Sequence, residues 1–265
     1  MYEFDYHRAA SLADAVSQLK QVGDSKPLAG GMTLLPTCKM RLARPAKLVD
    51  LGAIAALKGI VISDTHVTIG AMTRHADVAA SKELAAALPA LCVLAGGIGD
   101  PQVRNRGTMG GSVANNDPAA DYPSACLGLG ATIVTDRREI AADDYFQGLF
   151  QTALEEDEII AAIRFPRPDC AAYVKFKNPA SRYATVGVFV SRKGSVVRVA
   201  VTGAGSDGVF RVAELEAALA KTFAPDAVAS IKVPGDGLSS DMHGSAEYRA
   251  HLIPVLAARA VEACK

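Results

Sequence analysis

The segment Ile98–Asp121, IGDPQVRNRGTMGGSVANNDPAAD, constrains the fold more than any other part of this sequence. It places small, turn-forming and polar residues between two apolar segments. Its centre contains Gly107, Gly110 and Gly111, and glycine lets a backbone adopt positive φ and approach another backbone or a ligand closely. We therefore expect this segment to make such a close approach.

A second glycine pair, Gly30-Gly31 in LAGGMTLL, lies far upstream between two short apolar runs. A strand-to-helix turn of this kind presents free backbone N–H groups, which bind anions. Two such turns suggest one shared anion, such as a diphosphate. The spacing alone leaves a nucleotide site and a pair of structural turns equally open. Neither segment contains GxGxxG or GxxxxGK[ST], which disfavours a Rossmann dinucleotide fold and a P-loop NTPase.

Length and composition limit the class of protein. The chain has 265 residues, of which 50% are hydrophobic and 21% charged, and its formal net charge is +0. It is long enough for a sizeable core and two domains. Balanced charge argues against a nucleic-acid surface, and the longest apolar stretches are too short to span a bilayer. Because the N-terminus also lacks a signal-peptide pattern, we expect a cytoplasmic protein without stable membrane insertion.

The five cysteines are spread along the chain with no CxxC spacing. This pattern indicates no iron–sulfur cluster, no zinc site and no disulfide framework, so we expect no metal ligand.

Hydrophobic periodicity and turn residues predict an alternation of helices and strands. We expect helices at residues 12–23, 32–44, 73–80, 82–95, 117–127, 212–223 and 245–263, with Pro89 interrupting the helical segment at 82–95. We expect strands at residues 26–29, 47–51, 60–62, 67–70, 131–134, 159–165, 173–177, 184–191 and 196–203. The first two strands should be parallel, the next two should form a hairpin, and the last three an antiparallel sheet. Two prolines at 166 and 168 mark a domain boundary.

The two glycine segments together carry a resemblance to a known family. LAGGMTLLP and IGDPQVRNRGTMGGSVANNDPAAD resemble the FAD-binding medium subunit of the molybdenum hydroxylases, the family of bacterial xanthine dehydrogenases and aerobic carbon monoxide dehydrogenases. The likeness extends over the whole chain, including GAGSDGVFRVAELEAAL and the tail DMHGSAEYRAHLIPVLAARAV.

The resemblance implies an α+β fold with a two-part FAD-binding domain of the vanillyl-alcohol-oxidase/PCMH type. That domain combines a small α/β subdomain with a mixed β subdomain that also carries helices, and a small C-terminal domain of antiparallel sheet covered by helices follows it. We expect the FAD-binding domain at residues 1–167, with subdomains of about 1–57 and 58–167, and the C-terminal α+β domain at residues 168–265.

The resemblance also implies which residues contact a non-covalently bound FAD. The first segment would hold the diphosphate, with Thr33 keeping the hydroxyl of the family's usual serine, and the second would contact phosphate and sugar. The implied residues are Leu28, Ala29, Gly30, Gly31, Met32, Thr33, Leu34, Leu35, Gly99, Val103, Thr108, Gly110, Gly111, Ser112, Asn115, Asp121, Ile159, Ile160 and Lys177.

Several of these and other polar residues have two interpretations. Asp121 is a candidate acceptor for ribityl or ribose hydroxyls, and Lys177 is either a positive charge near the flavin or a solvated strand residue. Tyr183 would lie over the flavin or pack in a core. We expect His75 on a helix surface and the acidic turn at residues 155–158 in solvent. Arg104 and Arg106 would face phosphate or pair with nearby carboxylates.

In the family that the chain resembles, the FAD subunit receives electrons from iron–sulfur clusters and passes them to an external acceptor. The implied partners are a large molybdopterin-binding subunit and a small [2Fe-2S] subunit, arranged as a dimer of heterotrimers. We expect no catalytic side chain in this chain. Two alternatives remain open, a stand-alone flavin oxidoreductase using NAD(P)H and a non-catalytic assembly subunit. NAD, quinone and oxygen are all open as acceptors.

Overall fold

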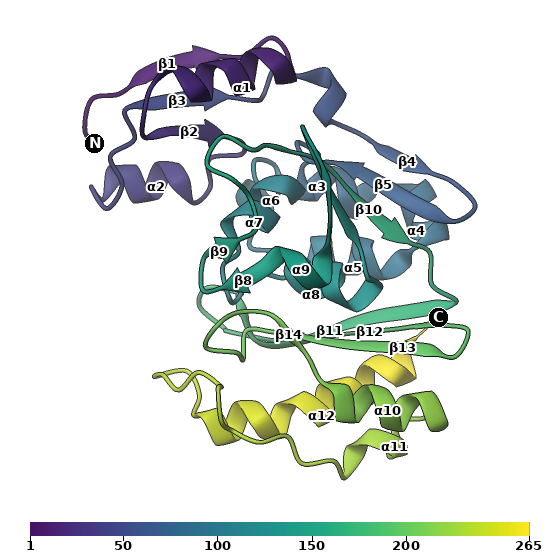
Figure 1. The fold of residues 1–265 in the computed structure, drawn as a ribbon. Coiled ribbons are helices and arrows are strands. Elements are labelled where there is room, and N and C mark those ends of the chain that lie inside the picture. The colour runs from purple at the N-terminus through teal and green to yellow at the C-terminus, as the bar shows by residue number, and fades with distance from the viewer. Residues whose placement is uncertain (265) are drawn as a thin grey trace.

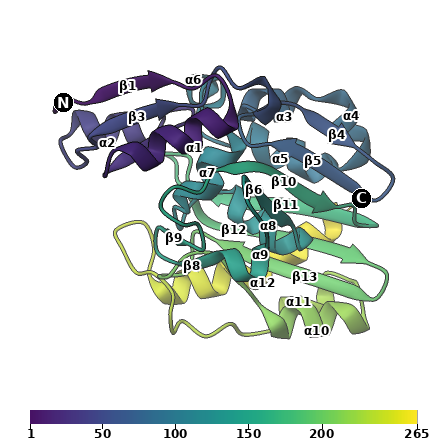
Figure 2. The same ribbon diagram turned by 45° about the horizontal axis from the view of Figure 1, so that its top comes forward.

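The structure, a computed structural model, describes residues 1–264 and stacks three layers of mixed helix and sheet (Figure 1). The predicted α+β class is confirmed. The first layer is a parallel sheet in the order β1-β3-β2, formed by β1 (Asp5–Arg8), β2 (Ser25–Leu28) and β3 (Lys47–Asp50). Helix α1 (Leu12–Gln21) lies alongside this sheet in Figures 1 and 2, and α2 (Leu34–Lys39) follows β2.

Two details of this layer differ from the sequence expectation. Strand β1 was not predicted because its residues are polar and mostly exposed, so it has no apolar alternation. Helix α2 ends at Lys39, well short of residue 44, because Arg41 takes a left-handed conformation with φ of 62°. The predicted parallel pairing of the strands at 26–29 and 47–51 is confirmed.

The middle layer contains an antiparallel sheet in the order β4-β5-β10-β6-β7. Its strands are β4 (Ile60–Ile62), β5 (His66–Gly70), β6 (Thr132–Thr135), β7 (Glu139–Ala141) and β10 (Ile160–Pro166). The predicted hairpin of β4 and β5 is confirmed. Short elements lie in the segments before and between these strands. They are η1 (Ala55–Leu57), α9 (Ala142–Tyr145), β8 (Phe146–Gly148) and β9 (Gln151–Thr152).

The helices of this layer contribute a large part of the central core, together with the strands of the middle sheet. These helices are α3 (His75–Ala80), α4 (Lys82–Ala87), α5 (Pro89–Gly96), α6 (Pro101–Arg104), α7 (Met109–Asn115) and α8 (Tyr122–Leu129). The predicted interruption at Pro89 is confirmed: α4 ends at Ala87, and Pro89 begins α5 after an irregular Leu88.

The predicted helix start at Asp117-Pro118 is wrong. Residues 117–120 form a turn in which the Asp117 carboxylate accepts the Ala119 N–H at 2.8 Å. The Pro118 carbonyl accepts the Gly203 N–H at 2.8 Å, which ties this turn to the third layer. Helix α8 therefore begins only at Tyr122.

The third layer is an antiparallel sheet of β11 (Cys170–Lys177), β12 (Ala184–Lys193), β13 (Val196–Thr202) and β14 (Phe210–Arg211). Helices α10 (Ala213–Lys221), α11 (Asp226–Ala229) and α12 (Ala246–Ala263) cover its outer face (Figure 1). Phe189 packs into the central core, whereas Val188 and Val190 pack with the helices. Both faces of this sheet are therefore covered, which explains the unbroken apolar run of β12.

Candidate cofactor-binding cavity

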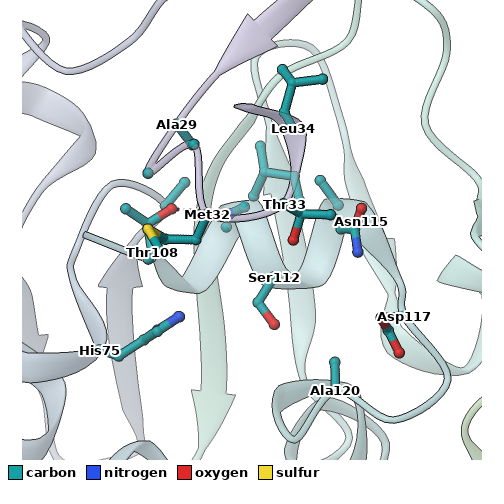
Figure 3. Close-up of a pocket in the computed structure, with 18 of the residues that line it drawn as sticks. Ala29, Met32, Thr33, Leu34, His75, Thr108, Ser112, Asn115, Asp117 and Ala120 are labelled. Carbon is teal, nitrogen blue, oxygen red and sulfur yellow. Dashed lines mark hydrogen bonds between the residues drawn. The ribbon is translucent and has the colours of Figure 1, made fainter. Parts of the chain in front are cut away.

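A cavity of about 550 Å³ is lined by the two glycine segments, the start of α3, the start of β10 and residues 181–183 (Figure 3). Most residues implied by the resemblance line it. These are Ala29, Gly30, Gly31, Met32, Thr33, Leu34, Gly99, Val103, Thr108, Gly110, Gly111, Ser112, Asn115, Asp121, Ile159 and Ile160. Three do not: Leu28, Leu35 and Lys177.

The two glycine segments touch each other through their backbones. A Cβ atom on Gly30 would lie 2.1 Å from the Arg106 carbonyl oxygen, so only glycine fits there. The close backbone approach expected from the sequence is therefore present, and it joins the two glycine segments to each other.

The first segment presents backbone donors to the cavity. Gly31 has φ of +73°, and the N–H groups of Gly31, Met32 and Thr33 make no hydrogen bond within residues 1–264. Leu28 and Leu35 lie behind this turn, where their side chains would contact a Cβ on Gly31. Consecutive unpaired N–H groups with positive φ nearby are a suitable anion cradle.

The second segment uses its backbone donors to hold itself in place. The Met109 and Gly110 N–H groups donate to the carbonyls of Thr73 and Ala71 at 3.0 and 2.8 Å. The Gly111 N–H donates to the Thr108 hydroxyl at 3.2 Å, which caps α7. The expectation that Gly110-Gly111 offers free backbone donors is therefore wrong.

The second segment instead presents side chains. Ser112 and Asn115 lie on α7, and Figure 3 shows both beside the cavity, facing the turn that carries Asp117 and Ala120. Burial raises the pKa of Asp117 from its usual value. A nucleotide here would meet backbone N–H groups on one wall and hydroxyl and amide groups on the other.

Asp121 is buried and already engaged within the protein. Its Oδ1 accepts a hydrogen bond from the Tyr173 hydroxyl at 2.5 Å and lies 2.9 Å from Lys175 Nζ. Burial raises the pKa of Asp121, and the Lys175 ammonium limits that rise. Lys175 also donates to the Arg182 carbonyl at 3.1 Å. Asp121 thus ties the cavity wall to the segment at residues 181–183.

Lys177 does not provide a charge in the cavity. It is exposed at the end of β11, whereas Lys175 is only 7% exposed in its side chain. In a regular strand the two lysines would share a face, but the register with β12 shifts between Phe176 and Lys177. Lys177 lies beyond this irregularity, is exposed, and does not line the cavity.

His75 is buried, which corrects the expectation of a surface residue. It is 4% exposed and lines the cavity from the first turn of α3. Burial, together with the Arg104 guanidinium, lowers the pKa of His75 to about 4. No sequence motif marked it, because a single histidine at a helix start has no spacing signal.

The acidic turn at residues 155–158 is only partly solvated. Glu158 is buried and accepts hydrogen bonds from Arg138 Nη2 and the Thr135 hydroxyl, both at 2.7 Å. Arg138 lowers the pKa of Glu158 to about 2. Glu158 also lines the cavity, next to Ile159.

The other open residues are resolved by their contacts. Arg104 Nη1 donates to the carbonyls of Ile98 and Gly99, both at 3.0 Å, so it braces the second segment. Tyr183 is 47% exposed and lines the cavity, so it is not a core residue. Leu51, Met72, Phe150 and Leu154 also line the cavity, and nothing in the two motifs marked them.

Comparison with known proteins identifies the family. The model described as the FAD binding domain in molybdopterin dehydrogenase matches residues 2–168. The chain belongs to this family. The resemblance inferred from the two glycine segments is thereby confirmed, and FAD is the cofactor of the FAD-binding domain.

Several relatives of this FAD-binding family match nearly the whole chain. The carbon monoxide dehydrogenase medium chain of Afipia carboxidovorans is 41% identical, with 99% of this chain and 96% of the relative covered. The nicotine 6-hydroxylase medium subunit of Paenarthrobacter nicotinovorans is 38% identical, with 97% and 95% covered. A solved carbon monoxide dehydrogenase from Hydrogenophaga pseudoflava has a TM-score of 0.87 at 35% identity, with 99% and 97% covered.

The cavity fits FAD by its own chemistry. The unpaired N–H groups of the first segment suit a diphosphate, and Ile159 and Ile160 offer an apolar wall. Within residues 1–264, no group of three His, Cys, Asp or Glu side chains could hold a metal ion. No helix in that range is long and apolar enough to cross a bilayer.

Proposed function

We propose that this chain is the FAD-carrying electron-transfer subunit of a molybdenum-containing hydroxylase. In that role it passes electrons from iron–sulfur clusters of a partner subunit through FAD to an external acceptor. The observation that carries the proposal is the row of unpaired N–H groups at Gly31, Met32 and Thr33 in a family defined by FAD binding. The high coverage of medium-chain relatives supports the subunit role.

The binding residues follow from the cavity. The N–H groups of the first segment hold the FAD diphosphate, and Thr108, Ser112 and Asn115 face it from the second. Ile159 and Ile160 pack against the cofactor, which binds without a covalent bond. FAD supplies the two-electron and one-electron chemistry when bound. The protein side chains orient it and exclude water.

Asp121 affects the cofactor indirectly, by holding the wall of the cavity in position. Its contacts with Tyr173 and Lys175 hold the third layer against the cavity wall, and Lys175 fixes the carbonyl of Arg182 beside Tyr183. Lys177 has no part in this proposal, since it does not line the cavity.

We also propose the domain layout implied by the resemblance. Residues 1–167 form an FAD-binding domain of the vanillyl-alcohol-oxidase/PCMH type, and residues 168–265 form a C-terminal α+β domain. The family model ends at residue 168, which supports this boundary. The shared core around Tyr173 and Phe189 means that the two domains pack tightly rather than move freely.

The proposed partners are a large molybdopterin-binding subunit and a small [2Fe-2S] subunit, in a cytoplasmic dimer of heterotrimers. The relatives are named for carbon monoxide and for nicotine, although their medium chains are similar to this one. Such variety is expected if the substrate pocket belongs to another subunit. The proposed substrate chemistry is therefore that of the large subunit.

Purification from the native host tests this function. We expect a yellow protein that releases one FAD per chain on heat denaturation and co-purifies with a molybdenum-containing large chain and an iron–sulfur chain. Reduction of the flavin by substrate only in the presence of both partners would support the subunit role. Turnover with NAD(P)H by the chain alone would favour a stand-alone oxidoreductase, and colourless protein that FAD does not stabilise would favour an assembly subunit.

A further inference from the structure

We propose that His75 binds the flavin nucleotide directly, with its Nε2–H donating a hydrogen bond into the cavity. This inference rests on the proposed function, because it requires FAD in this cavity. Neither of the two glycine motifs contains His75.

The first observation is an unpaired polar group in a buried place. Within residues 1–264, the buried side-chain atoms without a hydrogen-bond partner are His75 Nδ1, Asn116 Oδ1 and Tyr122 OH. The His75 ring packs against the Tyr122 ring at 5.3 Å between centroids. The fully buried atom of this ring is Nδ1, which the proposed bond does not reach. Nε2 is not among these fully buried atoms and makes no hydrogen bond within residues 1–264, so it is the ring nitrogen left free to bind a ligand in the cavity.

The second observation is the direction of the ring. Figure 3 shows the side chain extending from the start of α3 toward Ser112, with a ring nitrogen at its end. A Cβ atom on Gly107 would lie 2.5 Å from His75 Nε2, so the absent side chain of Gly107 makes room for this nitrogen. The backbone N–H of His75 donates to the Gly107 carbonyl at 3.0 Å, which fixes the start of α3 against the second segment. The ring is therefore held against the second segment with its tip at the cavity.

The charge state follows from the surroundings. The ring is buried, and the facing charged group is the Arg104 guanidinium, so both lower the pKa of His75 to about 4. A neutral imidazole has one N–H donor and one acceptor nitrogen. A buried N–H without a partner is rarer than an unpaired acceptor, which places the proton on Nε2 and leaves Nδ1 as the buried, unpaired acceptor. The ring then offers one neutral donor to an acceptor atom of the nucleotide.

The test compares FAD affinities of full-length variants, titrated by flavin fluorescence after removal of bound flavin, in the assembly in which the chain purifies. We expect His75→Phe to raise the Kd about tenfold, because one neutral hydrogen bond is lost. His75→Gln, whose amide reaches the place of Nε2, should recover most of the affinity. His75→Asn, whose amide reaches only the place of Nδ1, should not. His251→Gln, at an exposed position on α12, is the matched control and should bind like the wild type.

The outcomes separate this inference from the function. Equal Kd values for wild type and His75→Phe would overturn it while leaving FAD binding intact. If the phenylalanine variant does not fold, equal affinities of the glutamine and asparagine variants would overturn it instead. A wild-type chain that binds no FAD in any assembly would contradict the proposed function itself.

Discussion

The two glycine segments look alike in sequence but differ in what their backbones do. In the first, the N–H groups of Gly31, Met32 and Thr33 remain unpaired at the cavity. In the second, the N–H groups of Met109 and Gly110 bind the carbonyls of Thr73 and Ala71, which lie between β5 and α3. Glycine is needed in both places for close backbone approach, yet only the first segment leaves donors for an anion. A glycine pair therefore marks close packing more dependably than it marks a ligand.

The largest expected effect is at the junction of the two segments. Gly30→Ala would place a Cβ atom 2.1 Å from the Arg106 carbonyl, a backbone atom that cannot rotate away. We expect the free energy of unfolding of the FAD-free protein to fall by about 3 kcal/mol or more. Urea unfolding of purified protein measures this loss.

The matched control for this junction is Gly23→Ala, where a Cβ would have no neighbour within 4 Å. It should change the free energy of unfolding by less than about 0.5 kcal/mol. If Gly30→Ala were equally mild, the contact between the two segments would not be a fixed part of the fold.

The sequence located these segments well but could not assign their separate roles. Most of the residues implied by the family motifs line one cavity, because a turn and its flanking residues stay together in the chain. The hydrogen-bond partner of Gly110 is Ala71, which lies in another part of the sequence. The expectation for His75 was wrong because a tertiary packing partner buries it. The two interpretations of Lys177 could not be separated from the sequence, because the strand irregularity next to it has no sequence signal.

The next largest expected effect tests whether the second segment is packed firmly against the protein core. The backbone N–H of His75 donates to the Gly107 carbonyl of the second segment. Burial lowers the pKa of the His75 imidazole from 6.5 to about 4. Between about pH 4 and pH 6.5, the His75 imidazole is therefore protonated in the unfolded chain but neutral in the folded chain. Stability from this residue is full above pH 6.5 and is lost as the pH falls toward 4. Between pH 7 and pH 5 we expect a loss of about 2 kcal/mol.

Urea unfolding of FAD-free wild type and His75→Phe at both pH values isolates this loss. The phenylalanine variant has no group to protonate, so its decline should be smaller by about that amount. Parallel declines of the two proteins would mean that the His75 ring reaches water in the folded state, and that the second segment is less firmly packed than its hydrogen bonds indicate.

A smaller effect is expected at the cap of α7. The Thr108 hydroxyl accepts the Gly111 N–H, so Thr108→Val should lower the free energy of unfolding by about 1 kcal/mol. Thr108→Ser keeps the hydroxyl and should stay within about 0.5 kcal/mol of the wild type. Thermal unfolding of the FAD-free chain compares the three proteins. No loss in the valine variant would show that the cap does not hold the second segment.

The smallest effect on stability is expected at Thr33, which occupies the same cap position before α2. Its side chain makes no capping hydrogen bond, and Figure 3 shows its hydroxyl directed toward the cavity. Thr33→Val should therefore leave the FAD-free stability unchanged within about 0.5 kcal/mol. Its FAD affinity should fall about fivefold, as expected for one lost hydrogen bond, and Thr33→Ser should restore it. Titration of flavin-free protein measures this change.

Thr108 and Thr33 hold equivalent cap positions. Opposite responses of stability and affinity at these two sites would therefore distinguish a structural glycine turn from a ligand-binding one. If Thr33→Val instead destabilised the FAD-free protein as Thr108→Val does, the first segment would also be using its polar groups to hold the fold.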